Sequence, residues 1–233
     1  QYATEQLAAL GQAEAAQARH SQYFAEFMRA QEPELKGPRQ LATMQAIDRD
    51  FDNIRLAWVW SLERRHAANL HLMLNPLYLF GFLGRRHVDT IVIFQQSLAQ
   101  PIDDPPLLGR LLARRWGSLH WWFQSASDYQ EALASIERAL AIAQAEGNRF
   151  EEAFCRLMAG YALMGMQRPA EALAHLERSK ALFEALGEPF FVSWALSRLG
   201  YLHAALHDPD KEIAAMEQSL ALARAMHNRF ALF

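Results

Sequence analysis

Apolar and polar positions alternate with a helical period along most of this chain. Between residues 39 and 65 the apolar side chains recur at steps of three and four residues, namely at Met44, Ile47, Phe51, Ile54, Trp58 and Leu62. Such steps place side chains on one face of an α-helix. The opposite face carries Arg49, Asp50, Asp52 and Arg55. The pattern predicts one amphipathic helix from about Arg39 to Arg65, with further helices over residues 13–31, 67–83 and 86–100.

The second half of the chain repeats itself at an interval of forty residues. EALASIERALAIA from Glu131 returns as EALAHLERSKALF from Glu171 and as KEIAAMEQSLALA from Lys211. Each copy follows another helical pattern, so each unit is a helical hairpin. The first helices are predicted at 110–126, 150–167 and 190–207, and the second helices at 129–146, 169–186 and 209–226. A single hairpin cannot cover its apolar face, and such units therefore stack into a solenoid.

Composition narrows the class of protein. Alanine, leucine, glutamate, glutamine and arginine, all good helix formers, are abundant, and no alternating β-branched pattern stands out. The formal net charge of −3 gives no overall attraction to nucleic acid or anionic lipid, and no run of eighteen apolar residues predicts a membrane span. The single cysteine, Cys155, excludes an internal disulfide. It fits a reducing compartment, so we expect a cytoplasmic protein.

The repeat resembles the tetratricopeptide repeat (TPR) family. The residues that match its pattern are Trp116, Leu119, Phe123, Ala132, Ile136 and Ala139 in the first clear unit, Gly160, Ala172 and Leu176 in the second, and Leu199, Gly200 and Ser219 in the third. The resemblance implies an all-α, right-handed superhelical solenoid whose concave groove usually binds peptides. We therefore expect a divergent N-terminal helical segment at 1–100 and repeats at 107–233. The expected units are about 107–147, 148–187 and 188–227, with the start of a further helix at 228–233, which suggests a piece of a longer protein.

Residues 32–63 resemble a second kind of sequence, the stretch that leads into TPR repeats in bacterial STAND-type signal-transduction NTPases. The matching residues are Pro33, Glu34, Leu35, Gly37, Asp52, Asn53, Arg55 and Trp58. The resemblance implies that the chain is the sensor or partner-binding arm of a signalling or transcription-regulating protein. No GxxxxGK[ST] phosphate loop occurs here. Any NTPase activity would therefore lie outside this chain, which we predict is not an enzyme.

One row of aromatic residues is the best candidate binding site. Trp121, Tyr161 and Tyr201 follow one another at the repeat interval, on one side of the predicted first helices. The TPR resemblance implies that this side lines the groove. The predicted groove also includes Phe154, Leu157, Met164 and Trp194. Two interpretations stay open, because an exposed row would mark an interaction site, whereas a covered row would be packing between helices.

Arg114 is the one candidate anion contact in the predicted groove, and it can equally be a solvated charge of its helix. The charged clamp with which some chaperone-binding relatives hold a C-terminal carboxylate has no counterpart, because Gly117, Leu157 and Ser197 occupy clamp positions.

The remaining chemistry-bearing residues favour structural roles. His203 and His207 are four residues apart and could share a helix face toward a metal, but no third ligand converges on them. Asp48, Asp50 and Asp52 alternate along a helix and so do not share a face. Cys155 has no identified base beside it. We predict no catalytic site, no metal and no cofactor.

The leading functional hypothesis is a recognition module that binds a protein or peptide in its concave groove. Two alternatives stay open: a pocket for a small-molecule effector within the solenoid, and a scaffold whose aromatic row mediates self-association. Nucleic acid and membrane are not expected partners.

Overall fold

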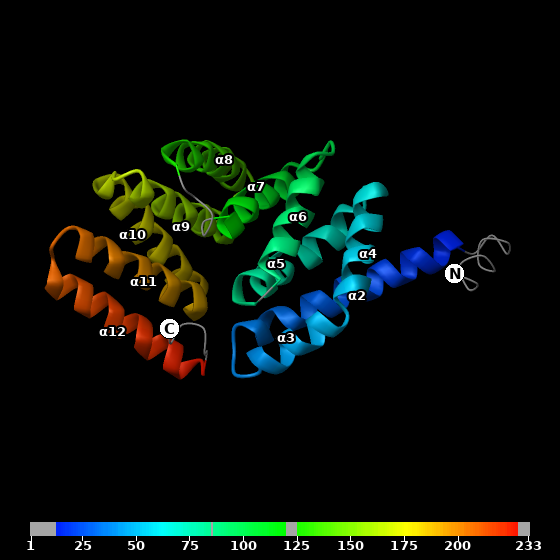
Figure 1. Ribbon diagram of the computed structural model, residues 1–233, viewed down its shortest axis with the longest axis horizontal. Coiled ribbons are helices and arrows are strands. Elements are labelled where there is room, and N and C mark those ends of the chain that lie inside the picture. The colour runs from blue at the N-terminus through cyan, green and yellow to red at the C-terminus, as the bar shows by residue number, and fades with distance from the viewer. Residues whose placement is uncertain (1–12, 85, 120–124, 228–233) are drawn as a thin grey trace. The chain divides into compact units, whose positions relative to one another are not determined.

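The structure is a computed structural model that describes residues 13–84, 86–119 and 125–227, in which helices are joined by turns and short irregular connections (Figure 1). Its first helices are α2 (Ala13–Leu35), α3 (Gln40–Arg49), α4 (Phe51–Glu63), α5 (Ala67–Leu83) and α6 (His87–Leu98). They are followed by α7 (Pro105–Leu119), α8 (Ala126–Ala145), α9 (Arg149–Gly165), α10 (Pro169–Leu186), α11 (Pro189–Ala205) and α12 (Pro209–Ala225). The prediction of an all-α solenoid built from hairpins is confirmed.

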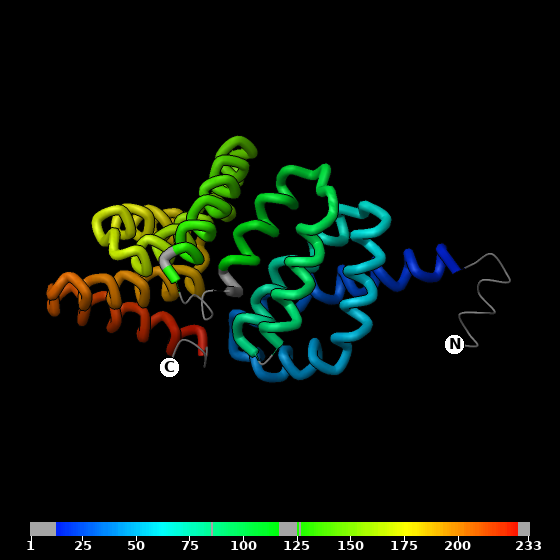
Figure 2. Tube along the Cα trace, turned by 45° about the horizontal axis from the view of Figure 1, so that its top comes forward, coloured from blue at the N-terminus to red at the C-terminus, as the bar shows by residue number. Residues whose placement is uncertain are grey.

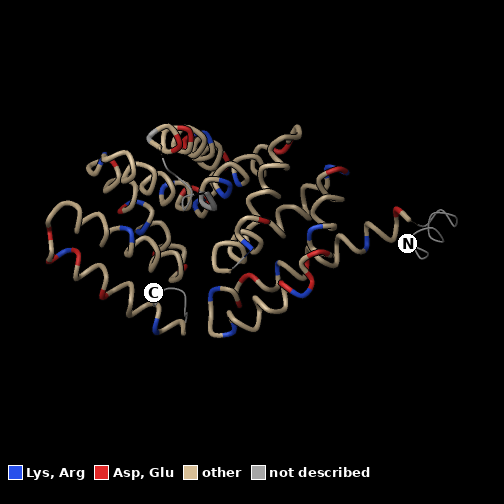
Figure 3. Tube along the Cα trace, in the orientation of Figure 1, with Lys and Arg blue, Asp and Glu red and all other residues tan. Residues whose placement is uncertain are grey.

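The chain divides into two compact units. The first comprises Gln1–Leu35 with Arg39–Ile93, and the second comprises Lys36–Pro38 with Phe94–Phe233. In the first unit α2 packs against α3, α4 and α5, as the tube in Figure 2 shows. Figure 3 shows cationic and anionic positions interspersed along the helices of both units, which agrees with the small net charge. Among the described residues, every helix is too short or too polar to cross a bilayer.

The single helix predicted from Arg39 to Arg65 is wrong, because α3 ends at Arg49 and α4 begins at Phe51. Asp50 between them has φ −102° and ψ 12°, so one residue leaves the helical conformation. The apolar stripe survives this break. Ile47, Ile54 and Trp58 are all buried in the core of the first unit, because a one-residue turn preserves the spacing of three and four residues on which the prediction rested.

Helix α7 begins inside the segment 101–109, which was expected to interrupt the helices. Asp104 accepts a hydrogen bond from the backbone N–H of Leu107 at 2.8 Å, and Pro105 occupies the first helical position. An acidic N-cap followed by proline starts a helix, because the carboxylate satisfies a free N–H and proline has none to satisfy. Asp104 and Pro105 therefore form the N-terminal end of α7, in addition to separating it from α6.

The hairpins of the second unit form two rows (Figure 1). Helices α7, α9 and α11 make the first-helix row, and α8, α10 and α12 make the second-helix row. Each helix packs against the next along the chain, and α9 also contacts both α7 and α11. Within the described residues, direct contacts along the second-helix row are fewer. The first helices are therefore in closer contact with one another than the second helices are.

Equivalent side chains repeat their contacts from one hairpin to the next. The Ser179 hydroxyl donates to the Ala153 carbonyl at 2.8 Å, and forty residues on the Ser219 hydroxyl donates to the Ser193 carbonyl at 2.8 Å. These serines tie each second helix to its own first helix. They are buried, so each hydroxyl satisfies a backbone oxygen where water is excluded.

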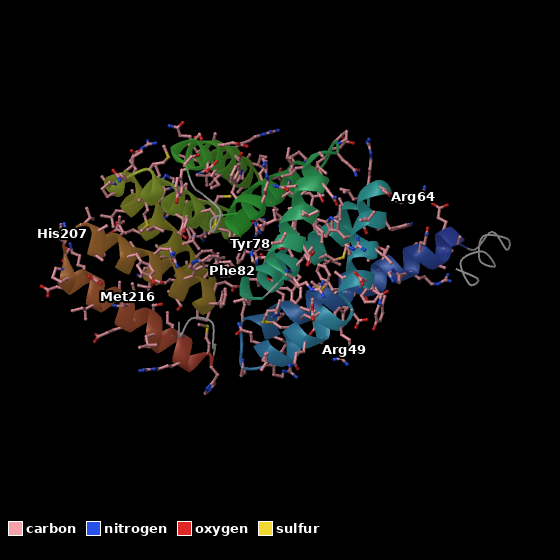
Figure 4. All side chains as sticks on the ribbon, in the orientation of Figure 1. Arg49, Arg64, Tyr78, Phe82, His207 and Met216 are labelled. Carbon is pink, nitrogen blue, oxygen red and sulfur yellow. The ribbon has the colours of Figure 1, made fainter. Side chains whose placement is uncertain are left out.

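The close approach of the two helices in the α9–α10 and α11–α12 hairpins depends on a glycine. A Cβ atom at Gly160 would lie 2.6 Å from Leu176, and one at Gly200 would lie 2.7 Å from the Met216 methyl group. Figure 4 labels Met216 on α12. The turns repeat as well, because Gln167 and His207 both have φ 58°. Residues that lie forty positions apart in the sequence therefore make equivalent contacts in the structure.

Candidate partner-binding surface

Two of the three predicted aromatic residues lie in the described part of the chain. Tyr161 projects from α9 and is half-buried, and Tyr201 projects from α11 with 50% of its surface exposed. Burial raises the pKa of the Tyr161 hydroxyl above its usual value, and the nearby Arg198 guanidinium partly offsets that rise. Trp121 lies outside the described residues. The first-helix row therefore carries at least one large aromatic ring open to solvent.

An arginine that the sequence reasoning overlooked lies between the two tyrosines. Its guanidinium carbon is 5.5 Å from the centre of the Tyr161 ring and 5.0 Å from the centre of the Tyr201 ring. Both distances fall within the range of cation–π attraction. Arg198 is partly exposed, while its Nε atom is covered and has no hydrogen-bond partner.

Two further residues from the predicted set lie partly exposed on the same helices. Trp194 sits one turn before Arg198 on α11, and Met164 follows Tyr161 on α9. The Trp194 ring is stacked with Phe191, with 6.2 Å between ring centroids and 21° between planes. Tyr161, Met164, Trp194, Arg198 and Tyr201 are called the first-helix surface below.

Phe154 and Leu157, which were also predicted to line the groove, are fully covered. The Phe154 ring meets Trp194 edge to face at 6.5 Å and also meets Phe191 edge to face at 6.2 Å. Phe154 and Leu157 therefore present no surface to a partner. Phe154, together with the buried Phe191, instead supports the partly exposed Trp194 ring.

Arg114 is buried, so its interpretation as a solvated helix charge is wrong. It is 0% exposed and forms an ion pair with Glu151 of α9 through both terminal nitrogens. Its guanidinium lies 4.1 Å from the centre of the Phe154 ring. Arg110 of α7 reaches the same carboxylate at 3.0 Å. Glu151 therefore joins α7 to α9 beneath the surface, where charged groups require partners.

The other candidate metal-binding and catalytic residues are buried, paired or distant from one another. His203 is buried, whereas His207 lies exposed at the turn after α11 (Figure 4). Cys155 is buried, and burial raises its thiol pKa to about 12. Asp48 forms an ion pair with Arg86 at 2.8 Å. Within the described residues, no three side chains of metal-ligating type gather at one point.

Neither Arg198 nor Glu151 could be selected from the sequence. The one available signal for Arg198 is that it precedes Tyr201 by three residues and so shares its helix face. Whether a carboxylate reaches it depends on α9 and the other neighbouring helices, which no local pattern reveals. Glu151 looks like one more acidic residue in the first turn of α9, where acidic residues are common.

Comparison with known proteins shows which repeat family the second half of the chain resembles. A family model for the tetratricopeptide repeat matches residues 156–225, which contain α10, α11, α12 and most of α9. These residues form a TPR-type repeat region. Among solved structures, the crystal structure of BtubC (BKLC) from P. vanneervenii is similar, with a TM-score of 0.55 and 17% sequence identity over 75% of this chain and 74% of that chain. At that identity the similarity shows the fold alone. No curated protein matches the chain.

Proposed function

We propose that the chain is a recognition module whose first-helix surface binds a protein or peptide partner. TPR repeats generally mediate protein–protein interaction and are typically non-catalytic. The observation that carries the proposal for this chain is the exposed aromatic group on the first-helix row, with Tyr201 at 50% exposure beside the partly exposed Trp194.

Physical reasoning supports this surface as a place for a partner. Tyrosine and tryptophan combine a large apolar area with a polar end, and they are enriched among residues that dominate binding energies. Covering such a side chain contributes roughly 1.5–3 kcal/mol. The Trp194 ring packs against the buried rings of Phe154 and Phe191, so it loses little conformational entropy when a partner covers it.

The finer part of the proposal concerns the parent protein. The resemblance of residues 32–63 to the segment that leads into repeats in STAND-type NTPases supports a role as the sensor arm of a larger signalling or transcription-regulating protein. Partner binding to the first-helix surface would then be relayed to an NTPase elsewhere in the parent chain. A parent sequence with a phosphate loop upstream of these residues supports this part, and a parent without one removes its basis.

A pocket for a small-molecule effector receives less support. A crevice bordered by α7, α8 and α9 has a cavity volume of only about 20 Å³, and its lining residues include Gly109, Arg110, Ile142 and Cys155. Ligand pockets usually measure about 300–1,000 Å³. The crevice also lies over the Arg110–Glu151 ion pair, so a ligand there would compete with a contact that joins two helices.

The proposal is tested by selecting short random peptides on the purified chain and measuring their affinities by fluorescence anisotropy. The variant combines Tyr161→Ser with Tyr201→Ser, and the matched control is Tyr23→Ser, because Tyr23 is 64% exposed in the first unit. We expect the double variant to keep its helical circular dichroism and to bind selected peptides at least about tenfold more weakly. The control should bind them as the unchanged protein does.

Three outcomes contradict the proposed surface. Failure to select any peptide argues against a peptide-recognition module, and equal binding by the double variant places recognition elsewhere. Loss of helicity in the double variant shows that the tyrosines serve the core. Adding Trp121→Ser extends the test to the third predicted aromatic residue. Sedimentation over a range of concentrations tests self-association separately, since a monomer throughout that range contradicts the scaffold alternative.

A further inference from the structure

The partly covered arginines of the second unit are paired with carboxylates, with one exception. Arg110 and Arg114 meet Glu151, Arg156 meets Glu152 at 2.9 Å, and Arg115 approaches Glu131 at 3.9 Å. Arg198 makes no ion pair within the part of the chain that the structure describes. Its guanidinium instead lies over two neutral rings, those of Tyr161 and Tyr201.

An arginine in this position is unfavourable for the free protein. Burial of the side chain lowers the pKa of the Arg198 guanidinium, and Tyr161 and Tyr201 oppose that change only in part. Its Nε–H is covered without an acceptor. Charged groups removed from water are normally compensated by an opposite charge and by hydrogen bonds. Ring faces attract the cation, but they do not replace an oxygen acceptor for its N–H groups.

The site lies where a partner is expected. Arg198 is partly exposed, Tyr201 beside it is half-exposed, and Trp194 is one helical turn away on the same helix. A ligand that covers the rings of the first-helix surface therefore passes over Arg198. Because the guanidinium is already held between two rings, it loses little freedom on binding, and its planar donors suit the two oxygens of a carboxylate.

The single positive charge of Arg198 indicates which anionic group of a partner would bind it. Among the described residues, the charged or titratable groups that affect the pKa of Arg198 are Tyr161 and Tyr201, and neither is a cation. Phosphate groups carry close to two negative charges and are generally recognised by clusters of arginines. A single cation matches a single negative charge, as on an aspartate, a glutamate or a C-terminus.

We propose that Arg198, held between Tyr161 and Tyr201, forms an ion pair with one carboxylate of the protein or peptide partner. The inference rests on the proposed function, since it names one chemical requirement of the ligand at the same surface. It differs from an attachment at Arg114, which is already occupied by Glu151. The partner segment is therefore acidic at one point and apolar beside it, where it covers Trp194 and Tyr201.

The test compares matched peptides on matched proteins. Peptides selected on the unchanged chain are resynthesised with each carboxylate replaced by a carboxamide, including the C-terminus. The proteins are the unchanged chain, Arg198→Gln, Arg198→Lys and the control Arg178→Gln, which removes an exposed charge from α10. Circular dichroism establishes that each variant is folded before its affinities are measured.

We expect one carboxylate-to-carboxamide change to weaken binding to the unchanged protein about tenfold or more. In Arg198→Gln that preference should fall below about twofold, while Arg178→Gln retains it and Arg198→Lys retains a part of it. Arg198→Gln should melt no lower than Arg178→Gln, because it removes a charge that has no ion-pair partner among the residues that the structure describes.

The outcomes separate this inference from the proposed function. Peptides that bind with no carboxylate preference, or with a preference that Arg198→Gln leaves intact, contradict the role of Arg198 and leave the proposed function standing. An equal loss of acidic and carboxamide binding in Arg198→Gln and Arg198→Lys shows that the arginine only shapes the surface. If no peptide binds the unchanged chain, both proposals fail.

Discussion

Replacing Gly160 by alanine tests how closely the two helices of a hairpin pack. The added Cβ would lie 2.6 Å from both Cγ and Cδ2 of Leu176 and 3.4 Å from the Ala172 carbonyl oxygen. Leu176 is 0% exposed, and its branch point cannot swing aside as the tip of a long side chain does. Overpacking a core of this kind costs about 1–3 kcal/mol, and a contact with a buried branch point belongs at the upper end.

Helix propensity opposes that cost. Alanine is about 1 kcal/mol more favourable than glycine inside a helix. The net expectation for Gly160→Ala is therefore a loss of about 2 kcal/mol of the free energy of unfolding, or about 4–8 °C in melting temperature. Gly200→Ala is the matched comparison, because its Cβ would meet Met216, which is unbranched and partly exposed. Its packing cost and propensity gain should nearly cancel.

Guanidinium chloride denaturation followed by circular dichroism measures the difference between these two variants. The reasoning predicts that the midpoint for Gly160→Ala lies clearly below that for Gly200→Ala. If the two variants match, or if Gly160→Ala is the more stable, then the contact between Gly160 and Leu176 is not as close as the structure shows.

Three further predictions concern buried and half-buried groups. Glu151→Gln should lower the free energy of unfolding by about 3–5 kcal/mol in denaturant titrations, because it leaves two arginines without their carboxylate; the surface control Glu184→Gln should cost about 0.5 kcal/mol or less, and similar losses for both would refute the buried ion pair. Cys155, with its thiol pKa raised to about 12 by burial, should resist iodoacetamide at about pH 8 until the protein is denatured; rapid labelling of the native protein would contradict its burial. Burial, assisted by Arg156, lowers the pKa of His175 below its ordinary 6.5, and Glu137 and Glu171 only partly offset this. The unfolded chain therefore binds the proton first as pH falls, so stability should decline below about pH 6.5, and the melting temperature of His175→Gln should decline less over the same range.

The sequence predicted the hairpins well because helical periodicity and turn residues act locally. The helix expected at 169–186 is α10, Pro169–Leu186, since Pro169 opens it and Gly187, with φ 68°, ends it. Asp50 shows the limit of that reasoning. Its one-residue departure from helical geometry leaves the apolar stripe in register, so nothing in the periodicity reveals that α3 and α4 are separate helices.

The candidate site was predicted less completely, because its properties depend on partners distant in sequence. Helical spacing placed Tyr161 and Met164 on the same side of one helix, but it cannot tell whether an arginine is paired. Arg114 looked exposed and is held by Glu151, thirty-seven residues away. No sequence pattern singled out Arg198. Among the described residues, it is the partly covered arginine of the second unit that forms no ion pair.

The most direct test of partner binding at the first-helix surface is a two-dimensional NMR titration of the labelled chain with a selected acidic peptide. We predict that the largest shifts occur at Tyr161, Trp194, Arg198 and Tyr201, including the Arg198 side-chain signal, while α8, α10 and α12 change little on their outer faces. Shifts concentrated on those outer faces, or in the first unit, would contradict the account.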